Sequence, residues 1–290
     1  MSEFLLTYHH LFNVFLIASG YALSQWVVLR AGVFSIATAG MAAIGAYGAA
    51  LLTMRWGWHY LLALLAATVL GAFAGLLLSW PLARLRGVFQ AIATLAFVQV
   101  VMAIALYADS LTGGAMGLNA IPNPVGTVHA LLAVVAVVYL MTAISATRLG
   151  RAFEAIRQNE AVASALGVSV NFHQALAFAI SGAIAGLFGG LEAFQSYTLF
   201  PATFGFRAVI AALSYVVLGG RRSVAGHIVG AAILLVLPEI SRPLADYRMA
   251  LYGAVLMLVI AFLPRGIVDT AWLALRRQRL ARRRSEEPAG

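Results

Sequence analysis

The longest polar interruption in this chain runs from Thr147 to Val170 and reads TRLGRAFEAIRQNEAVASALGVSV. Its charged side chains recur at every third position, namely Arg148, Arg151, Glu154, Arg157 and Glu160. Leu149, Phe153 and Ile156 follow the i, i+4, i+7 spacing that places side chains on one face of a helix. The stretch therefore predicts a short amphipathic helix between membrane spans, and such a helix needs a partner outside the membrane.

The composition around this stretch is that of a membrane protein. Hydrophobic residues make up 62% of the 290 residues, charged residues only 10%, and the mean hydropathy is +0.93. Soluble domains carry about 25% charged residues, so burial in a water-soluble fold does not account for the shortage. We expect an all-α polytopic membrane protein, a bundle of about nine transmembrane helices within a range of about eight to ten. Cysteine is absent, which excludes disulfides and thiolate metal sites.

Hydrophobic runs separated by polar or arginine-containing breaks mark the expected spans. They cover residues 11–29, 31–54, 59–80, 88–107, 128–147, 173–197, 207–219, 224–240 and 248–264. The runs 207–219 and 224–240 are short, so they form either two spans or one broken or re-entrant element. The runs are continuously apolar, whereas the strands of a membrane β-barrel alternate apolar and polar residues.

The arginines predict the orientation of these spans. All 19 cationic side chains are arginines, and the net charge is +9. In a soluble chain this balance would suggest nucleic acid, but in a membrane protein arginines mark the cytoplasmic side. With nine alternating spans and a cytoplasmic C-terminus, the arginines left outside are Arg55, Arg207, Arg242 and Arg248. We therefore expect a periplasmic N-terminus, a cytoplasmic segment 147–172 and outward-facing loops at 108–127 and 198–206.

The two ends of the chain differ in character. The first ten residues, MSEFLLTYHH, have no basic region and no small-residue cleavage site, so we expect no cleaved signal peptide. At the other end, residues 276–290 are rich in arginine and form a basic cytoplasmic tail that contacts anionic lipid. Residues 1–275 are expected to form one membrane domain.

No catalytic constellation is present in the sequence. Serine, histidine and acidic residues are too sparse within the spans to assemble a triad, and the six histidines show no HExxH or other metal-ligand spacing. A GxxxxGK[ST] motif is absent, so we do not expect this chain to hydrolyse ATP. The expected catalytic residues, metal ligands and bound cofactors are therefore none.

Polar groups inside the expected spans are few, and each is costly to bury, so each is a candidate for a translocation path. They are Gln25, Thr94, Gln99, Glu192, Gln195 and Glu239. Glu192 and Glu239 fall near the expected outer ends of their spans, where an interfacial carboxylate is at least as good an interpretation. Thr94 could instead hydrogen-bond within its own helix.

Small residues cluster where the spans should pack. The clusters read TAGMAAIGAYGAALL at 38–52 and SGAIAGLFGG at 181–190. This spacing lets helix backbones approach closely, and packing is our interpretation of most of these glycines. Some clusters could instead expose backbone polar groups to a solute. The candidates of this kind are Ser35, Thr38, Thr112, Gly113 and Gly114. The irregular loop 109–127 is long for a simple connection, so a gate or a docking surface is an alternative there.

The order of these motifs resembles the LivM-type permease subunit of bacterial branched-chain amino acid ABC importers. The matching stretches are FSIATAGMAAIGAYGAALL at 34–52, RLRGVFQAIATLAF at 84–97, LTGGAMGL at 111–118, RLGRAFEAIRQNEAVASALGV at 148–168, VVLGGRRSVAGHIVGA at 216–231 and LPRGI at 263–267. They follow the family's order and cover most of the chain. A single glycine-rich piece is weak, but the 148–168 segment followed by the later elements is specific.

The resemblance implies partners. In this family the permease pairs with a second, LivH-like permease in the bacterial inner membrane. Two cytoplasmic ABC ATPase subunits, which use ATP and Mg²⁺, dock beneath, and a periplasmic solute-binding protein delivers the solute. The chain itself is then half of a pore and not an enzyme, and no nucleic acid is involved.

The resemblance also assigns a role to the opening stretch. The residues that match the family's cytoplasmic coupling motif are Glu154, Ala155, Asn159, Glu160, Ala161 and Gly167. That motif fits a short helix into a groove on the ATPase. Arg151 and Arg157 belong to the same charged stripe, in which i, i+3 pairs contribute only ~0.2–0.5 kcal/mol each when exposed. This is too little to explain five charges, so we expect some of them to face a partner.

Three departures from the family's usual pattern are present. Ser35-Ile36-Ala37-Thr38 and Ala115-Met116 are expected near the solute path, whereas Arg221-Arg222 replace a more apolar pair. Related importers carry urea, short amides or aromatic acids, and these solutes are alternatives to branched-chain amino acids. An alternative of another class is an ion-coupled secondary transporter, although paired ionisable groups at the bilayer midplane, which it would need, are scarce.

Overall fold

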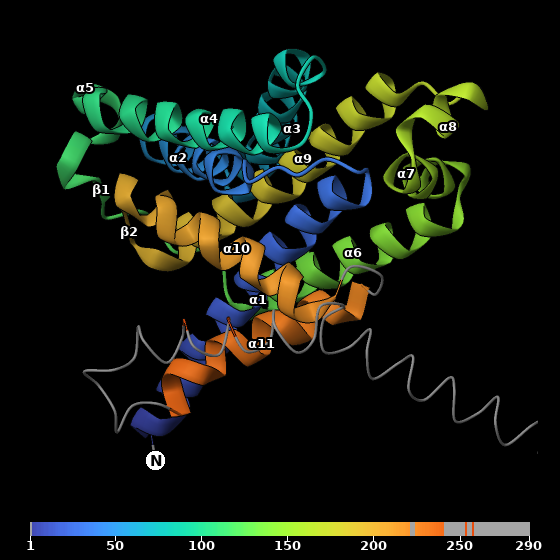
Figure 1. Cartoon of the computed structure of the whole chain (residues 1–290). Helices are drawn as coiled ribbons and strands as arrows, with labels where there is room; N and C mark the ends of the chain where they lie inside the picture. The colour runs from blue at the N-terminus through green and yellow to red at the C-terminus, as the bar shows by residue number, and fades with distance from the viewer. Residues whose placement is uncertain (1, 221–223, 241–252, 254–256, 258–290) are drawn as a thin grey trace, which may run out of the picture. The chain divides into compact units, whose positions relative to one another are not determined.

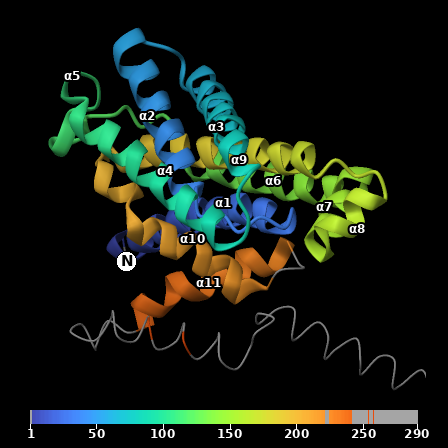
Figure 2. The same cartoon turned by 45° about the horizontal axis from the view of Figure 1, so that its top comes forward.

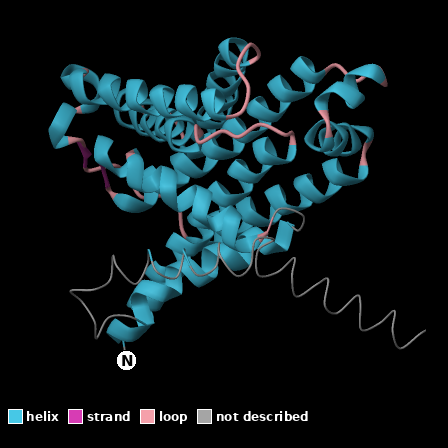
Figure 3. Ribbon diagram, in the orientation of Figure 1, coloured by secondary structure: helices cyan, strands magenta, loops and turns pink. Residues whose placement is uncertain are grey.

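The computed structural model describes residues 2–220, 224–240, 253 and 257, and α-helix dominates this part of the chain (Figures 1 and 3). The long helices are α1 (Ser2–Arg30), α2 (Thr38–Trp56), α3 (Tyr60–Leu82), α4 (Val88–Tyr107), α6 (Thr127–Ala146), α9 (Val170–Ser196), α10 (Phe206–Gly219) and α11 (Val224–Ile240). The short elements are α5 (Asp109–Thr112), η1 (Gly114–Met116), β1 (Leu118–Asn119), α7 (Arg148–Gln158), α8 (Glu160–Ala165), β2 (Thr198–Leu199) and η2 (Pro201–Phe204).

Six helical segments in the described part are long and apolar enough to cross a membrane. They are His9–Arg30, Tyr60–Leu82, Val88–Tyr107, Thr127–Ala146, Val170–Ser196 and Pro201–Gly219. The chain is therefore a helical polytopic membrane protein, as its composition predicts. The expected span 248–264 and the basic tail 276–290 lie outside the described residues, apart from two isolated positions.

The expected span 31–54 differs from the structure at its start. Helix α2 begins only at Thr38, and residues 31–37 are not helical. Gly32 adopts a positive φ of 81°, which favours glycine, and a Cβ there would lie 3.2 Å from the Cα of Arg157. Hydrophobicity did not reveal this break because the sequence remains apolar across it.

The chain divides into two compact units, with the boundary between Leu213 and Ser214. In the first unit, α9 packs against α1, α2 and α3 along most of its length. Gly71 and Gly186 bring α3 and α9 together, since a Cβ on Gly71 would lie only 2.9 Å from the Cα of Gly186. Close backbone approach through small residues is the packing that the glycine clusters predict.

The two ends of the first unit carry different elements. At one end β1 pairs antiparallel with β2, matching Leu118 with Leu199. Figures 1 and 2 show α5 at this end and α7 and α8 at the opposite end. The arginine side chains follow the same division, because Arg55 donates a hydrogen bond to the Ser110 carbonyl at the β1–β2 end. Arg30 donates to the Ser145 hydroxyl at the α7–α8 end.

In the second unit, α11 folds back along the end of α10. A Cβ on Gly230 would lie 3.1 Å from the Cα of Gly219, and Gly230 also meets the carbonyl of Tyr215. These contacts make an antiparallel helical hairpin. Helix α11 contains 17 residues, which at about 1.5 Å per residue is shorter than the ~30 Å hydrocarbon core.

Candidate functional site

The charged stretch after Thr147 forms two helices, α7 and α8, rather than the single helix that its spacing predicts. Asn159 separates α7 from α8 with extended backbone angles of φ −162° and ψ 112°. Its Oδ1 accepts hydrogen bonds from the backbone nitrogens of Ala161 at 3.0 Å and Val162 at 3.1 Å. Asn159 is therefore the N-cap of α8, a role that asparagine fills well because its side chain satisfies free amide groups.

The apolar ridge of α7 faces the protein's own helices. Phe153 is 2% exposed and Ile156 is 1% exposed. Phe153 lies beside Trp26 of α1 and Met141 of α6, which line the same small cavity. Leu149, the third residue of the predicted ridge, is half-buried. The ridge therefore anchors α7 on the spans and is not available to a partner.

Among the i, i+3 pairs of the charged stripe, Glu154 with Arg157 is the one that forms within the described residues. Arg157 donates to both oxygens of Glu154, with Nε 3.1 Å from Oε2, and Gln158 Nε2 lies 3.3 Å from Oε1. The hydrogen bonds from Arg157 lower the pKa of the Glu154 carboxyl, and this effect outweighs partial burial, which raises it. Arg151 is exposed and donates instead to the carbonyl of Ala146 at 3.2 Å.

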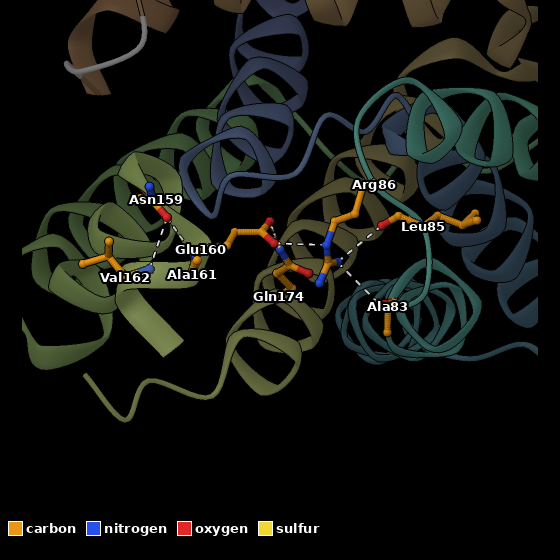
Figure 4. A network of polar contacts seen from close by, with 8 residues as sticks. All are labelled: Ala83, Leu85, Arg86, Asn159, Glu160, Ala161, Val162 and Gln174. Carbon is orange, nitrogen blue, oxygen red and sulfur yellow. Dashed lines mark hydrogen bonds and ion pairs between the residues drawn. The ribbon is translucent and has the colours of Figure 1, made fainter. Parts of the chain in front are cut away.

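Glu160 pairs across the fold rather than along its own helix. Its Oε2 lies 3.1 Å from Nε of Arg86, and its Oε1 accepts a hydrogen bond from Gln174 Nε2 at 3.1 Å (Figure 4). Arg86 in turn donates to the carbonyls of Ala83 at 3.4 Å and Leu85 at 3.3 Å. One carboxylate thus connects the start of α8 to the α3–α4 loop and to the first turns of α9.

None of the described residues covers the apolar face of α8. Val162 is 55% exposed, and Leu166, the C-cap four residues further on, is 77% exposed. Ala161 is exposed, whereas Ala155 of α7 is half-buried. Gly167 ends the helix with a φ of 82°, a conformation that a side chain would strain.

A groove of about 540 Å³ runs beside α8. Its lining residues are Arg86, Glu160, Ala161, Ser164, Ser169, Val170 and Asn171. The groove therefore lies between α8, the start of α9 and the α3–α4 loop. An exposed apolar strip next to a polar groove is the surface expected of a protein-docking site.

Four polar residues considered for the solute path gather in one buried cluster, which we call the polar core. They are Gln25, Ser35, Thr38 and Thr94, each 3% exposed or less. Gln25 Nε2 donates to the Ser35 carbonyl, and Thr38 Oγ1 donates to Gln25 Oε1 at 2.6 Å. The backbone nitrogen of Ile36 donates to Thr94 Oγ1 at 3.1 Å. The polar core therefore pairs the Ser35 carbonyl and the Ile36 amide of the non-helical segment, two backbone groups that would be costly to bury without partners.

The remaining path candidates lie apart from the polar core. Gln99 is on an exposed face of α4. Thr112 is buried at the β1–β2 end and donates to the Ala105 carbonyl at 2.6 Å. Gly113 and Gly114 follow it with φ values of 72° and 52°, so they form a turn that favours glycine.

The two partners of Glu160, Arg86 and Gln174, were not predicted from the sequence. Arginine counting placed Arg86 on the same side of the membrane as the 147–172 segment, but nothing in the spacing links it to Glu160. Gln174 carries no sequence signal at all, because a single glutamine near the start of an apolar helix is common. Both residues act through tertiary contacts.

Comparison with known proteins assigns this arrangement to a family. Residues 7–260 match the model of a family described as "Branched-chain amino acid transport system / permease component". The high-affinity branched-chain amino acid transport system permease protein LivM of Salmonella typhimurium is 32% identical over 83% of this chain, and so is LivM of Escherichia coli. The chain spans 65% of the length of these two relatives.

A probable LivH permease of Methanocaldococcus jannaschii is 31% identical over 45% of this chain and 44% of its own length. No solved structure matches the chain. The family match covers most of the sequence, including α7, α8, the polar core and the helices that support them. This chain therefore belongs to the permease component family of branched-chain amino acid transport systems.

Proposed function

We propose that this chain is a transmembrane permease subunit of an ATP-binding-cassette importer and forms half of its translocation path. The exposed apolar face of α8, formed by Val162 and Leu166 beside the groove at Glu160, is the observation that carries the proposal. A soluble partner that covered this face would remove apolar surface from water. The relatives are transport permeases and not enzymes, which supports the same conclusion.

The proposed assembly has four other protein components. They are a second, LivH-like permease, two ABC ATPase subunits and a periplasmic solute-binding protein. The ATPases bind ATP and Mg²⁺, and this chain binds neither. Helices α7 and α8 dock on an ATPase, and the residues that we propose for this coupling are Arg151, Glu154, Ala155, Arg157, Asn159, Glu160, Ala161 and Gly167.

The two coupling helices have separate tasks in this proposal. Helix α7 is anchored by Phe153 and Ile156, which supports its role as a rigid base. Helix α8 presents the contact surface. The Glu160 carboxylate connects that surface to Arg86 and Gln174, so a movement of α8 is passed to the α3–α4 loop and to α9.

The finer topology is part of the proposal. We place the chain in a bacterial inner membrane with about nine spans, a periplasmic N-terminus and a cytoplasmic C-terminus. Residues 1–275 form the permease domain and 276–290 its basic tail. The division of Arg55 from Arg30 and Arg86 between opposite ends of the first unit supports this orientation.

The solute that we propose is a branched-chain or similar small amino acid, as the names of the relatives indicate. Urea, short amides and aromatic acids are the alternatives within the same class of importer. The solute path includes the polar core, and its further candidate residues are Gln99, Thr112, Gly113 and Gly114.

Co-purification followed by reconstitution tests this function. The tagged chain is expected to bring with it a second permease and an ATPase, and the complex is expected to take up leucine only with ATP and a binding protein. Uptake driven by an ion gradient without ATP or partners would instead identify an ion-coupled secondary transporter. Purification of the chain alone, active without an ATPase, would contradict the proposal.

A further inference from the structure

A carboxylate lies near the end of the central helix, away from the coupling segment. Glu192 belongs to the last turns of α9, within a segment apolar enough to span a membrane. Tyr21 of α1 donates a hydrogen bond to its Oε2. Ionisable side chains within membrane spans are costly, and they mark substrate or ion paths more often than structural positions.

Glu192 borders a small cavity toward the interior of the first unit. This cavity measures about 40 Å³. Its polar lining consists of Glu192 and three hydroxyl groups, from Tyr21, Thr38 and Thr203. Apolar side chains such as Phe204 complete the wall, so the space offers one charge, hydroxyl groups and an aliphatic surface.

The same carboxylate borders a second cavity of about 100 Å³. His10, Asn13, Gln195 and Ser196 contribute polar side chains to this cavity. The Oδ1 of Asn13 and both amide atoms of Gln195 are buried without a hydrogen-bond partner among the described residues. Buried amides of this kind usually have partners, so these groups are suited to binding a polar guest.

Three polar side chains of α1 lie toward one side of the helix, because they follow one another at intervals of eight and four residues. They are Asn13, Tyr21 and Gln25, and Gln25 belongs to the polar core. Glu192 is the residue that both cavities share. It lies just before β2, at the end of the first unit that we assign to the periplasmic side.

We propose that Glu192 is the group that binds the ammonium of the transported solute. This inference rests on the proposed function and adds the residue that recognises the amino group of a zwitterionic solute. The carboxylate receives charge-assisted hydrogen bonds from the ammonium. The Gln195 amide donates to the solute carboxylate, and the cavity beside Phe204 receives the side chain.

The size of the cavities indicates when binding occurs. Both are smaller than the ~300–1,000 Å³ of typical ligand pockets, so the proposal requires them to merge around Glu192 before a solute fits. A carboxylate at this point repels anions, such as aromatic acids without an amine. It offers no charge-based advantage to neutral urea or to short amides.

Equilibrium binding to the assembled complex in nanodiscs, without the binding protein, tests the inference. The probes are radiolabelled L-leucine and 4-methyl-2-oxopentanoate, which replaces the ammonium of leucine by a keto oxygen. Sodium is replaced by N-methylglucamine. The wild-type complex is expected to bind leucine and to exclude the keto acid as a competitor. In Glu192→Gln, leucine affinity is expected to fall by about ten- to a hundredfold, the range for one charge-assisted hydrogen bond.

The matched control is Asp109→Asn, which removes an exposed carboxylate at the same end of the first unit and is expected to leave leucine affinity unchanged. Wild-type leucine affinity in Glu192→Gln would overturn the inference, as would equal competition by the keto acid or a requirement for sodium. The wild-type competition needs no variant, so it decides the question even if Glu192→Gln does not assemble. Failure of ATP-driven uptake or of subunit co-purification would instead count against the proposed function.

Discussion

The guanidinium of Arg86 and the carboxylate of Glu160 form an ion pair, with Nε 3.1 Å from Oε2. Arg86 lies in the loop between α3 and α4, and Glu160 is the first residue of α8. Gln174 of α9 shares the carboxylate, so three segments meet at one side chain. The pair is partly exposed, with side-chain exposures of 53% and 33%, so its direct effect on stability is small.

Its effect on coupling should exceed its effect on stability. We expect Arg86→Ala to leave the melting temperature of the complex nearly unchanged. The ATP hydrolysed per leucine transported should rise by about 1.4- to fivefold, which corresponds to an exposed pair worth ~0.2–1 kcal/mol. The charge-swapped double variant Arg86→Glu with Glu160→Arg should recover part of the loss. Identical ratios in wild type and Arg86→Ala would show that the ion pair does not transmit movement.

The apolar face of α8 should govern attachment of the ATPase. Leu166→Asp places a charge on the most exposed part of this face and should weaken co-purification of the ATPase by about tenfold or more, because a buried leucine contributes ~1.5–3 kcal/mol. Val128→Asp is the control. Val128 is also exposed, at 65%, but it lies in the first turn of α6, whereas α7 follows the last turn of that helix. Equal ATPase recovery from both variants would exclude α8 as the docking surface.

The Glu154–Arg157 pair predicts a pH dependence with a definite sign. The folded protein lowers the pKa of Glu154 below its ordinary value of 4.5, chiefly through hydrogen bonds from Arg157. The pair therefore stabilises the protein above pH 4.5, and this contribution is lost as the pH falls through the lowered pKa. Thermal unfolding of wild type and Glu154→Gln should differ at pH 7 by less than about 1 kcal/mol, given the exposure of the pair. The difference should vanish in strong acid, and a difference that grew toward low pH would refute this assignment.

A substitution of Thr94 tests whether its hydroxyl supports the fold or contacts the solute. Its Oγ1 accepts from the Ile36 nitrogen at 3.1 Å and donates to the Ala91 carbonyl at 2.9 Å. Thr94→Val keeps the shape but leaves a buried amide unpaired, which should cost about 1–3 kcal/mol of stability. A melting curve of the purified complex measures this cost. If stability were unchanged while the KM for leucine rose, Thr94 would contact the solute instead.

The contact between α3 and α9 should tolerate no added side chain. Gly71→Ala places a methyl group 2.9 Å from the Cα of Gly186, where only backbone could move away, and should cost about 1–3 kcal/mol. Gly126→Ala adds the same methyl group where no atom lies within 4 Å, and should be neutral. Comparable melting temperatures for the two variants would show that α3 and α9 can separate without cost.

The sequence predicts the helices better than it predicts their interruptions. The spans are long apolar runs, and lipid requires helix there because every backbone group must be paired within its segment. The break at residues 31–37 is equally apolar and so leaves no trace in the hydropathy. Its Ser35 carbonyl accepts a hydrogen bond from Gln25 of α1, and its Ile36 amide donates one to Thr94 of α4. Only the folded chain brings these residues together.

For residues 147–170, too, the sequence predicts some features and leaves others to the tertiary structure. Its place between spans, its charges and its family resemblance are all properties of the sequence, because polarity and motif order are local. The sequence alone could not decide which face of the segment meets a partner. The structure turns Phe153 and Ile156 inward and leaves Val162 and Leu166 uncovered. Asn159 produces this difference by ending one helix and capping the next, which changes the direction of the chain. Local patterns thus determined the kind of protein and its elements, whereas the pairing of Glu160 with Arg86 and of Glu192 with Tyr21 was decided by tertiary packing, which joins residues that the sequence keeps far apart.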